Sequence, residues 1–248
     1  MSMYGTLPWG VRLGTMLRLA WVWVSVPRLP APTVSDGVAP GRGQPVTLVG
    51  FGDSIIAGIG VATHTGSLVA QVAAHLSQGG RSVRWISVGR SGATAPMLDA
   101  MLDGPVTNDP DIILVSCGVN DVVRGRAPHA LAGDFRRFAR RARERWPTAV
   151  VVHAGIPPLE RFPALAGRLG EVLGRHGRSC IGAVRSAAIA ADALYVPFPA
   201  DVYAAHFARD GFHPNERGCA IWGKAVAQSI EAAGIEFPEG QHEGDSGL

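Results

Sequence analysis

Ser54, Asn120 and His213 are the residues of this chain whose types and settings could carry out nucleophilic chemistry. Ser54 closes Gly52-Asp53-Ser54 directly after the β-branched run 46–49, so its hydroxyl is expected at a tight turn after a strand. His213 lies three residues after Asp210, close enough for the carboxylate to hold one ring nitrogen. A serine hydroxyl needs a neighbouring base to become a useful nucleophile, and an imidazole oriented by a carboxylate is such a base. These residues predict acyl transfer through Ser54.

Two further stretches offer groups that could stabilise a developing negative charge. Gly89 ends the second expected strand and can present an unobstructed backbone N–H, and Asn120 follows the third strand with a side-chain amide. Each stretch also has a plain structural interpretation. Gly-Asp-Ser and Asn-Asp are common turn sequences, the segment 87–94 is rich in glycine, and Pro214 with Asn215 is a typical helix start.

Taken together, four blocks resemble the SGNH, or GDSL, hydrolase family. They are Gly52-Asp53-Ser54, Gly89, Gly118-Val119-Asn120-Asp121 and Asp210-Gly211-Phe212-His213, in the family's order and over residues 46–232. The resemblance implies a flavodoxin-like three-layer α/β/α sandwich with a central five-stranded parallel sheet. It also implies a catalytic triad of Ser54 as nucleophile, His213 as general base and acid, and Asp210 as its orienting partner. The implied oxyanion hole consists of the N–H groups of Ser54 and Gly89 and the side chain of Asn120.

Some positions depart from the family pattern. Ile55 replaces the usual Leu after the serine, Ser87 stands where many members have Asn, and Ala93 where many have Asp. The proline-rich loop 155–163 resembles the loop that lines the acyl side of the family's pocket, although such a loop can also be a plain connection. The substrate pocket is therefore expected to include these residues: Asp53, Pro157, Pro158 and Phe162.

The expected function is hydrolysis of small, short-acyl carboxylic esters, with no metal or organic cofactor. Two alternatives within hydrolases are a carbohydrate O-deacetylase and a thioesterase or lysophospholipase. An alternative of another class is a flavodoxin-like nucleotide-binding module without hydrolysis. Gly50-x-Gly52 begins a dinucleotide-binding pattern, but Ile55 stands where its third glycine would be, which argues against that module. The histidines show no metal-ligand spacing.

Strands and helices are expected to alternate from residue 46 to residue 235, which predicts right-handed crossovers and a parallel sheet covered on both faces. The expected strands are 46–51, 83–88, 112–116, 149–154 and 193–196. The expected helices lie near 66–78, 95–103, 128–146, 164–190 and 215–233. The polar tail 236–248 is expected to be flexible.

Residues 1–45 are expected to form an amphipathic helix and a Pro/Gly-rich linker. Leu13, Leu17 and Val24 share one helical face, and Arg12 and Arg18 interrupt the apolar run. The run 19–26 is shorter than the about 20 residues that a spanning helix needs. We therefore expect residues 10–26 to pack on the domain or to contact a membrane surface peripherally, in the cytoplasm. A secretion signal is the alternative, but Arg18 would shorten its apolar region and no A-x-A cleavage site follows.

Composition excludes several other classes. Hydrophobic residues make up 47% and charged residues 17% of the 248 residues, which suits a folded domain with a large core. The formal net charge is only +3, and the arginine-rich stretch 134–146 also carries a helical apolar stripe. We interpret its arginines as a solvated helix face rather than a nucleic-acid patch. The cysteines, Cys117, Cys180 and Cys219, are expected to be buried thiols, with a Cys180–Cys219 bridge as the alternative.

Overall fold

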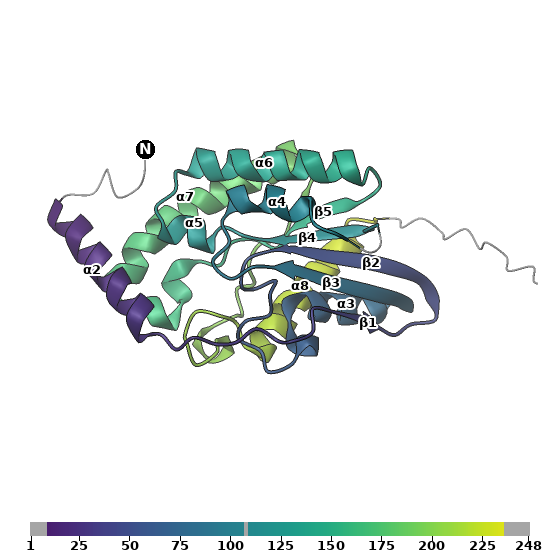
Figure 1. Ribbon diagram of the computed structural model, residues 1–248, viewed down its shortest axis with the longest axis horizontal. Coiled ribbons are helices and arrows are strands. Elements are labelled where there is room, and N and C mark those ends of the chain that lie inside the picture. The colour runs from purple at the N-terminus through teal and green to yellow at the C-terminus, as the bar shows by residue number, and fades with distance from the viewer. Residues whose placement is uncertain (1–8, 107–108, 236–248) are drawn as a thin grey trace, which may run out of the picture.

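The computed structural model describes residues 9–106 and 109–235 (Figure 1). Its described part contains a six-stranded sheet in the order β1-β3-β2-β4-β5-β6. The strands are β1 (Asp36–Ala39), β2 (Gly43–Gly52), β3 (Arg81–Gly89), β4 (Ile112–Ser116), β5 (Val150–His153) and β6 (Leu194–Tyr195). The strands β3, β2, β4, β5 and β6 are parallel to one another. Only β1 is antiparallel, and it pairs with β3.

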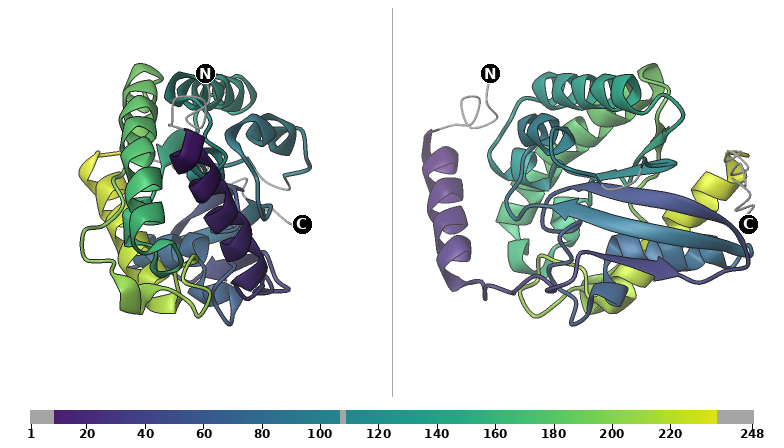
Figure 2. Two further views of the ribbon diagram at one scale, coloured as in Figure 1. Left: turned by 90° about the vertical axis from the view of Figure 1, so that its left-hand side faces the viewer. Right: turned by 45° about the vertical axis from the view of Figure 1, so that its right-hand side comes forward.

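Helices cover both faces of the sheet (Figures 1 and 2). On one face lie α3 (Leu68–Ser77) and α8 (Glu216–Ala232), and on the other α4 (Leu98–Leu102), α5 (Val119–Val123), α6 (Pro128–Arg145) and α7 (Arg168–Ala190). Short 3-10 turns lie at His64–Gly66, Ala95–Met97, Leu159–Arg161, Pro163–Leu165 and Ala204–His206. Side chains alternate along β2, so that Leu48 enters one core and Val49 the other. The predicted three-layer α/β/α sandwich is therefore confirmed.

The sheet has one strand more than the sequence predicted. β1 lies inside the segment expected to be a linker, and it extends the parallel sheet by an antiparallel edge strand. Its small residues explain the fit: a Cβ built at Gly37 would lie 2.8 Å from Cζ2 of Trp85, so the glycine lets the indole pack closely against the strand. The prediction of five parallel strands was correct for β2–β6 and incomplete for the whole sheet.

The predicted N-terminal helix forms as α2 (Trp9–Ser25) and lies at one end of the molecule, beside α7 (Figure 1). Leu19 is buried in the core that α6 and α7 share, which fixes this helix on the domain. Within the described residues, no helix is long and apolar enough to cross a membrane. The expectations for the first eight residues and for the tail 236–248 lie outside the described residues.

The arginines of α6 form ion pairs on the helix surface, as a solvated face requires. The opposite stripe of that helix is buried in the core and includes Phe135, Phe138, Ala139 and Ala142. The acidic partners of the arginines come from α4, α6 and the turns that follow α4 and α7: Asp99, Asp103, Asp134, Glu144 and Asp192. This pairing neutralises much of the basic surface.

Candidate active site

Ser54, His213 and Asp210 are joined by hydrogen bonds in series. Nε2 of His213 lies 2.8 Å from Oγ of Ser54, and Nδ1 of the same ring lies 2.5 Å from Oδ2 of Asp210. Ser54 follows β2, and the other two residues come from the loop before α8, so a separation of 159 residues is closed by the fold. The imidazole is about one fifth exposed, whereas the carboxylate is buried. The base therefore lies between a buried charge and an accessible hydroxyl.

The loop around Asp210 holds its carboxylate in one orientation. Oδ1 accepts hydrogen bonds from the backbone N–H groups of Phe212 at 2.9 Å and of His213 at 3.0 Å. Burial alone would raise the pKa of Asp210, but the hydrogen bonds from the His213 ring and from these two backbone groups outweigh it and lower the pKa below its ordinary value. Asp210 is thus held as a carboxylate that can orient the ring and stabilise an imidazolium.

The turn that carries Ser54 is fixed by contact between the ends of β2 and β4. Gly52 has a φ of +159°, and a Cβ there would lie 2.0 Å from the carbonyl oxygen of Ser116, so only glycine fits. The N–H of Asp53 then donates to that same oxygen at 3.1 Å. The next turn is closed by the bond from Ile59 N–H to the Ser54 carbonyl at 2.9 Å. Ser54 therefore stands on a rigid support at the carboxyl end of the sheet.

Asp53 lies buried behind Ser54 rather than at an accessible surface. Its side chain is buried, and Oδ1 accepts a hydrogen bond from the N–H of Ile55 at 3.0 Å. Burial raises the pKa of Asp53 to about 7, although the Ile55 bond and the nearby charge of His213 oppose that shift. The expectation that Asp53 contacts substrate is corrected, because the turn directs its side chain inward.

Asn120 lies in the first turn of α5, directly after β4 and Gly118. Its Nδ2 donates to the carbonyl oxygen of Ala93 at 2.9 Å. A primary amide has two N–H donors, so this bond orients the group and leaves the second donor for a ligand. The same contact places the loop after β3 beside Asn120.

The backbone N–H that accompanies Asn120 belongs to Gly92 rather than to Gly89. The sequence pattern had not singled out Gly92. The N–H of Arg90 donates to the carbonyl oxygen of Gly52 at 3.0 Å. Because N–H directions alternate along a strand, the N–H of Gly89 points away from β2 and the Ser54 turn. Gly92 adjoins Ala93, has a φ of +74°, and has open space around its α-carbon. Among the described residues, its N–H and that of Ser54 meet no acceptor. The segment Ser91-Gly92 was visible in the sequence, but spacing alone could not show that the N–H of Gly89 points away from the Ser54 turn.

The loop residues expected to line the acyl side are mostly buried. Phe162 is buried, with ring centroids 5.3 Å from Phe207 and 6.0 Å from Phe212. Pro157 is also buried, and only Pro158 is partly exposed. This side of His213 is therefore filled by aromatic packing, and Phe162 supports the histidine loop rather than offering a free surface.

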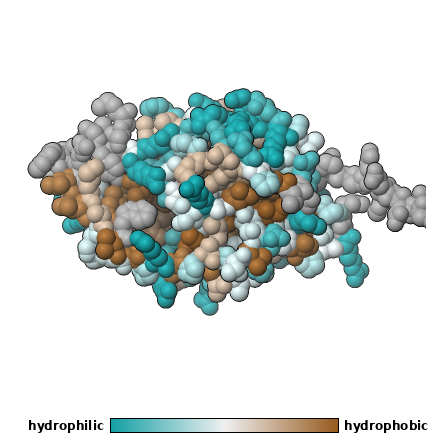
Figure 3. Space-filling model, viewed as in Figure 1, coloured by the Kyte–Doolittle hydropathy of each residue, from teal (hydrophilic) through white to brown (hydrophobic). Residues whose placement is uncertain are grey.

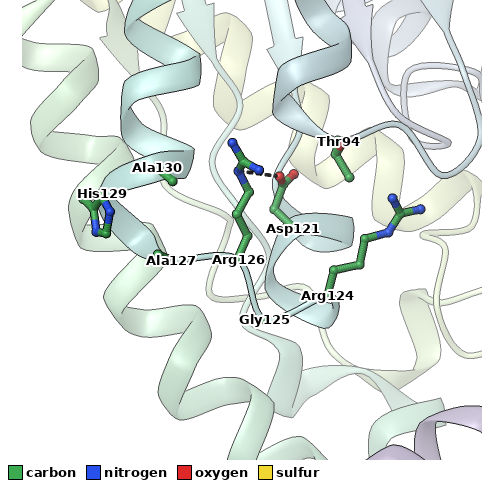
Figure 4. Close-up of a pocket in the computed structure, with 8 residues that line it drawn as sticks. All are labelled: Thr94, Asp121, Arg124, Gly125, Arg126, Ala127, His129 and Ala130. Atoms are coloured by element: carbon green, nitrogen blue, oxygen red, sulfur yellow. Dashed lines mark ion pairs between the residues drawn. The ribbon is translucent and has the colours of Figure 1, made fainter. Parts of the chain in front are cut away.

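A separate hollow of about 430 Å³ lies next to α5 and the start of α6 (Figure 4). Asp121 and Arg126 face each other across it, with Oδ1 and Nε 3.6 Å apart. Figure 4 shows Arg124 directed away from this pair, toward the loop that bears Thr94. Burial raises the pKa of Asp121 to about 6, against the hydrogen bond from Ala95 and the charge of Arg126. Asp121 thus ties α5 to the loop after β3 and so supports Asn120.

A base that can withdraw the proton of a serine hydroxyl at the carboxyl edge of a parallel sheet defines an α/β serine hydrolase. The sequence profile of the GDSL-like lipase/acylhydrolase family matches residues 51–221, so the chain belongs to this family and is a carboxylic ester hydrolase. No curated protein sequence matches the chain significantly.

Solved structures agree with the family assignment. TesA has 25% sequence identity to the chain, with a TM-score of 0.59 over 75% of this chain and 98% of TesA. The carbohydrate acetylesterase Est24 from Sinorhizobium meliloti has 16% identity and a TM-score of 0.58, over 76% of this chain and 99% of its own. The acetylxylan esterase Axe2 from Geobacillus stearothermophilus has 20% identity and a TM-score of 0.54, over 82% and 100%. The last two similarities concern the fold alone.

Proposed function

We propose that the protein hydrolyses small, short-acyl carboxylic esters through an acyl intermediate on Ser54. Oγ of Ser54 attacks the ester carbonyl while Nε2 of His213 takes the hydroxyl proton. The tetrahedral intermediate then collapses, the bond to the alcohol oxygen breaks, and His213 returns the proton to the departing alcohol. Water, deprotonated by the same ring, releases the acid and restores Ser54. The hydrogen-bonded series from Asp210 to Ser54 is the observation that supports this proposal.

The oxyanion of the tetrahedral state requires donors on the side of Ser54 away from its base. We assign the backbone N–H groups of Ser54 and Gly92 and the free N–H of Asn120 to this role. Support comes from the Asn120–Ala93 contact, which aligns the amide with the loop after β3, and from the two N–H groups without acceptors. Gly89 is left out because its N–H, at the end of β3, points away from the Ser54 turn.

The preference for short acyl chains is supported by the packing beside His213. Phe162 packs against Phe207 and Phe212 beside the histidine loop, and on this proposal these rings bound the acyl side of the site. A Cβ at Gly211 would lie 2.8 Å from the backbone nitrogen of Ala164, so the loop at 163–165 is in close contact with the histidine loop. A small acetyl or butanoyl group needs no displacement of these rings, whereas a long chain does.

The nucleophile is tested by labelling with a serine-reactive organophosphate, followed by peptide mass spectrometry. The adduct is expected on the peptide that contains Ser54, and Ser54→Ala should abolish it. Ser91→Ala is the matched control, because Ser91 is exposed on the neighbouring loop and should not be needed for labelling. An adduct on Ser91 or on Ser116 would refute the assignment.

The substrate class is tested with nitrophenyl esters from acetate to palmitate, together with acetylated sugars, acyl thioesters and lysophospholipid. The proposal expects the highest kcat/KM on the acetyl or butanoyl esters. A higher kcat/KM on palmitoyl esters, thioesters or lysophospholipid would favour the thioesterase or lysophospholipase alternative. A strong preference for acetylated sugars over simple acetyl esters would favour a carbohydrate O-deacetylase.

We also propose a reducing compartment, the cytoplasm, for this protein. All three cysteines, Cys117, Cys180 and Cys219, are free and buried, so the bridge left open by the sequence is not formed. Burial raises the pKa of Cys180 and of Cys219 to about 12, which keeps both thiols protonated and unreactive. Such thiols are typical of proteins that need no oxidative folding.

A further inference from the structure

The helix α2 has an outward apolar stripe that the domain does not cover. Leu17, Trp21 and Val24 are 63%, 70% and 87% exposed, and Leu13 and Met16 are exposed beside them. Spacings of three and four residues place these side chains on one side of the helix. In the hydropathy view, apolar atoms gather over this end of the molecule (Figure 3). Five of the nine exposed large apolar residues in the described part of the chain lie on this single helix.

This stripe is not the surface that holds α2 on the domain. Among the residues of α2 whose burial is described, Thr15 and Leu19 are buried, and they lie on its other side. Leu19 enters the core shared by α6 and α7. The helix therefore has two apolar faces, one bound to the protein and one directed outward, and the outward face needs a partner of its own.

The charge of the N-terminal segment indicates the partner. Residues 1–35 contain Arg12, Arg18 and Arg28 and no acidic residue, since the first is Asp36. Arg18 and Arg28 are exposed. A second copy docked through the same stripe would bring these cations together, whereas a surface of anionic headgroups would attract them. A basic helix with an apolar stripe and an outward tryptophan matches an in-plane membrane helix.

The position of α2 relates this stripe to the catalytic centre. The connection that follows the helix packs on the Ser54 turn, since a Cβ at Gly58 would lie 3.2 Å from Cδ of Pro32. Further on, Ser87 N–H donates to the carbonyl of Ser35 at 2.6 Å. Ala31, Pro32, Val34 and Ser35 also line a cavity of about 140 Å³ together with Ala57. The helix is thus held at the same edge of the sheet as the nucleophile (Figure 2).

We propose that α2 docks the protein in the plane of an anionic phospholipid surface. The stripe of Leu13, Leu17, Trp21 and Val24 enters the headgroup boundary, and Arg18 and Arg28 bind lipid phosphates. The 17-residue helix lies along the surface, with the Ser54 turn facing the interface. The proposal does not depend on which ester the enzyme hydrolyses.

Vesicle flotation of the full chain tests this proposal. The protein should float with vesicles of phosphatidylcholine and phosphatidylglycerol and much less with phosphatidylcholine alone, and added salt should weaken binding. The double variant Leu17→Gln/Trp21→Gln should lower partitioning at least about a hundredfold, because two large apolar side chains no longer enter the boundary. Arg18→Gln should lower it about fivefold on the anionic vesicles only.

Two controls separate docking from folding and from catalysis. Val38→Gln removes an exposed apolar side chain from β1, away from α2, and should float like the wild type. Ser54→Ala should also float normally, and the Leu17/Trp21 variant should keep its melting temperature and its activity on a soluble acetyl ester. Equal flotation of the Leu17/Trp21 variant and the wild type would overturn the proposal. So would light scattering that shows a dimer lost in that variant without any lipid binding, which would make a second copy the partner.

Discussion

The buried carboxyl of Asp53 makes the stability of this protein depend on pH in an unusual direction. Burial raises the pKa of Asp53 from its ordinary value of 3.8 to about 7 in the folded protein. In the unfolded chain the pKa stays near the ordinary value. Between these values the folded state binds the proton and the unfolded state does not. The free energy of unfolding therefore falls as the pH rises through this window.

The size of this effect follows from the shift. About three pKa units at about 1.4 kcal/mol each give about 4 kcal/mol of stability that is lost between about pH 4 and pH 7. Asp53→Asn removes the titration and keeps an oxygen that can accept the bond from Ile55 N–H. The variant should therefore be more stable than the wild type above about pH 7, with little difference near about pH 4.

Urea denaturation of both proteins at a series of pH values measures the difference directly. Subtracting one profile from the other removes the contribution of Asp210, whose lowered pKa acts with the opposite sign and at lower pH, and that of Asp121, whose raised pKa acts in the same direction. Parallel profiles for the two proteins would refute the reasoning. KM should stay unchanged in Asp53→Asn, because the residue lies behind the nucleophile.

Three further substitutions test the oxyanion site. Asn120→Ala should lower kcat about 10²- to 10³-fold and change KM much less, because its amide binds the oxygen only when that oxygen becomes an anion; near-normal kcat in the folded protein would leave Asn120 as a turn residue. Gly89→Ala should cause a large loss of stability, seen in melting curves, since its Cβ would lie 2.2 Å from the backbone nitrogen of Ala57. Gly92→Ala should still fold, at a cost of about 1–2 kcal/mol for its positive φ, and its main effect should be a lower kcat. A large loss of stability in Gly92→Ala together with a mainly lower kcat in Gly89→Ala would restore Gly89 as the donor.

The sequence was sufficient to predict the parallel core and the approach of Ser54, Asp210 and His213 to one another. The apolar runs that became β2, β4 and β5 are buried on both faces, so their composition reflects their place directly. Ser54, Asn120 and His213 follow strands or precede a helix, and parallel strands bring their carboxyl ends to one edge. The hydrogen bond between Ser54 Oγ and Nε2 of His213 is the geometry that this placement implies.

Features that depend on orientation or on distant packing could not be predicted in this way. That the N–H of Gly89 points away from the Ser54 turn follows from the alternation of the ladder, which composition does not record. Asp53 turns inward because Gly52 sits against the carbonyl of Ser116, a contact between two strands far apart in sequence. β1 has only four residues, and its pairing with β3 is visible only once Trp85 lies over Gly37.

The antiparallel strand β1 protects an otherwise open side of the molecule. Without it, β3 would become the border of the sheet and would present unpaired backbone groups along 83–86, where Val83 and Trp85 now pair with Ala39 and Gly37. Such a border is a template for strand addition by other chains. A cut within residues 26–35 would release α2 and leave β1 in place. A chain that begins at residue 46 would lose β1. The short segment 36–39 thus separates two outcomes of N-terminal trimming, a free catalytic domain and a self-associating one.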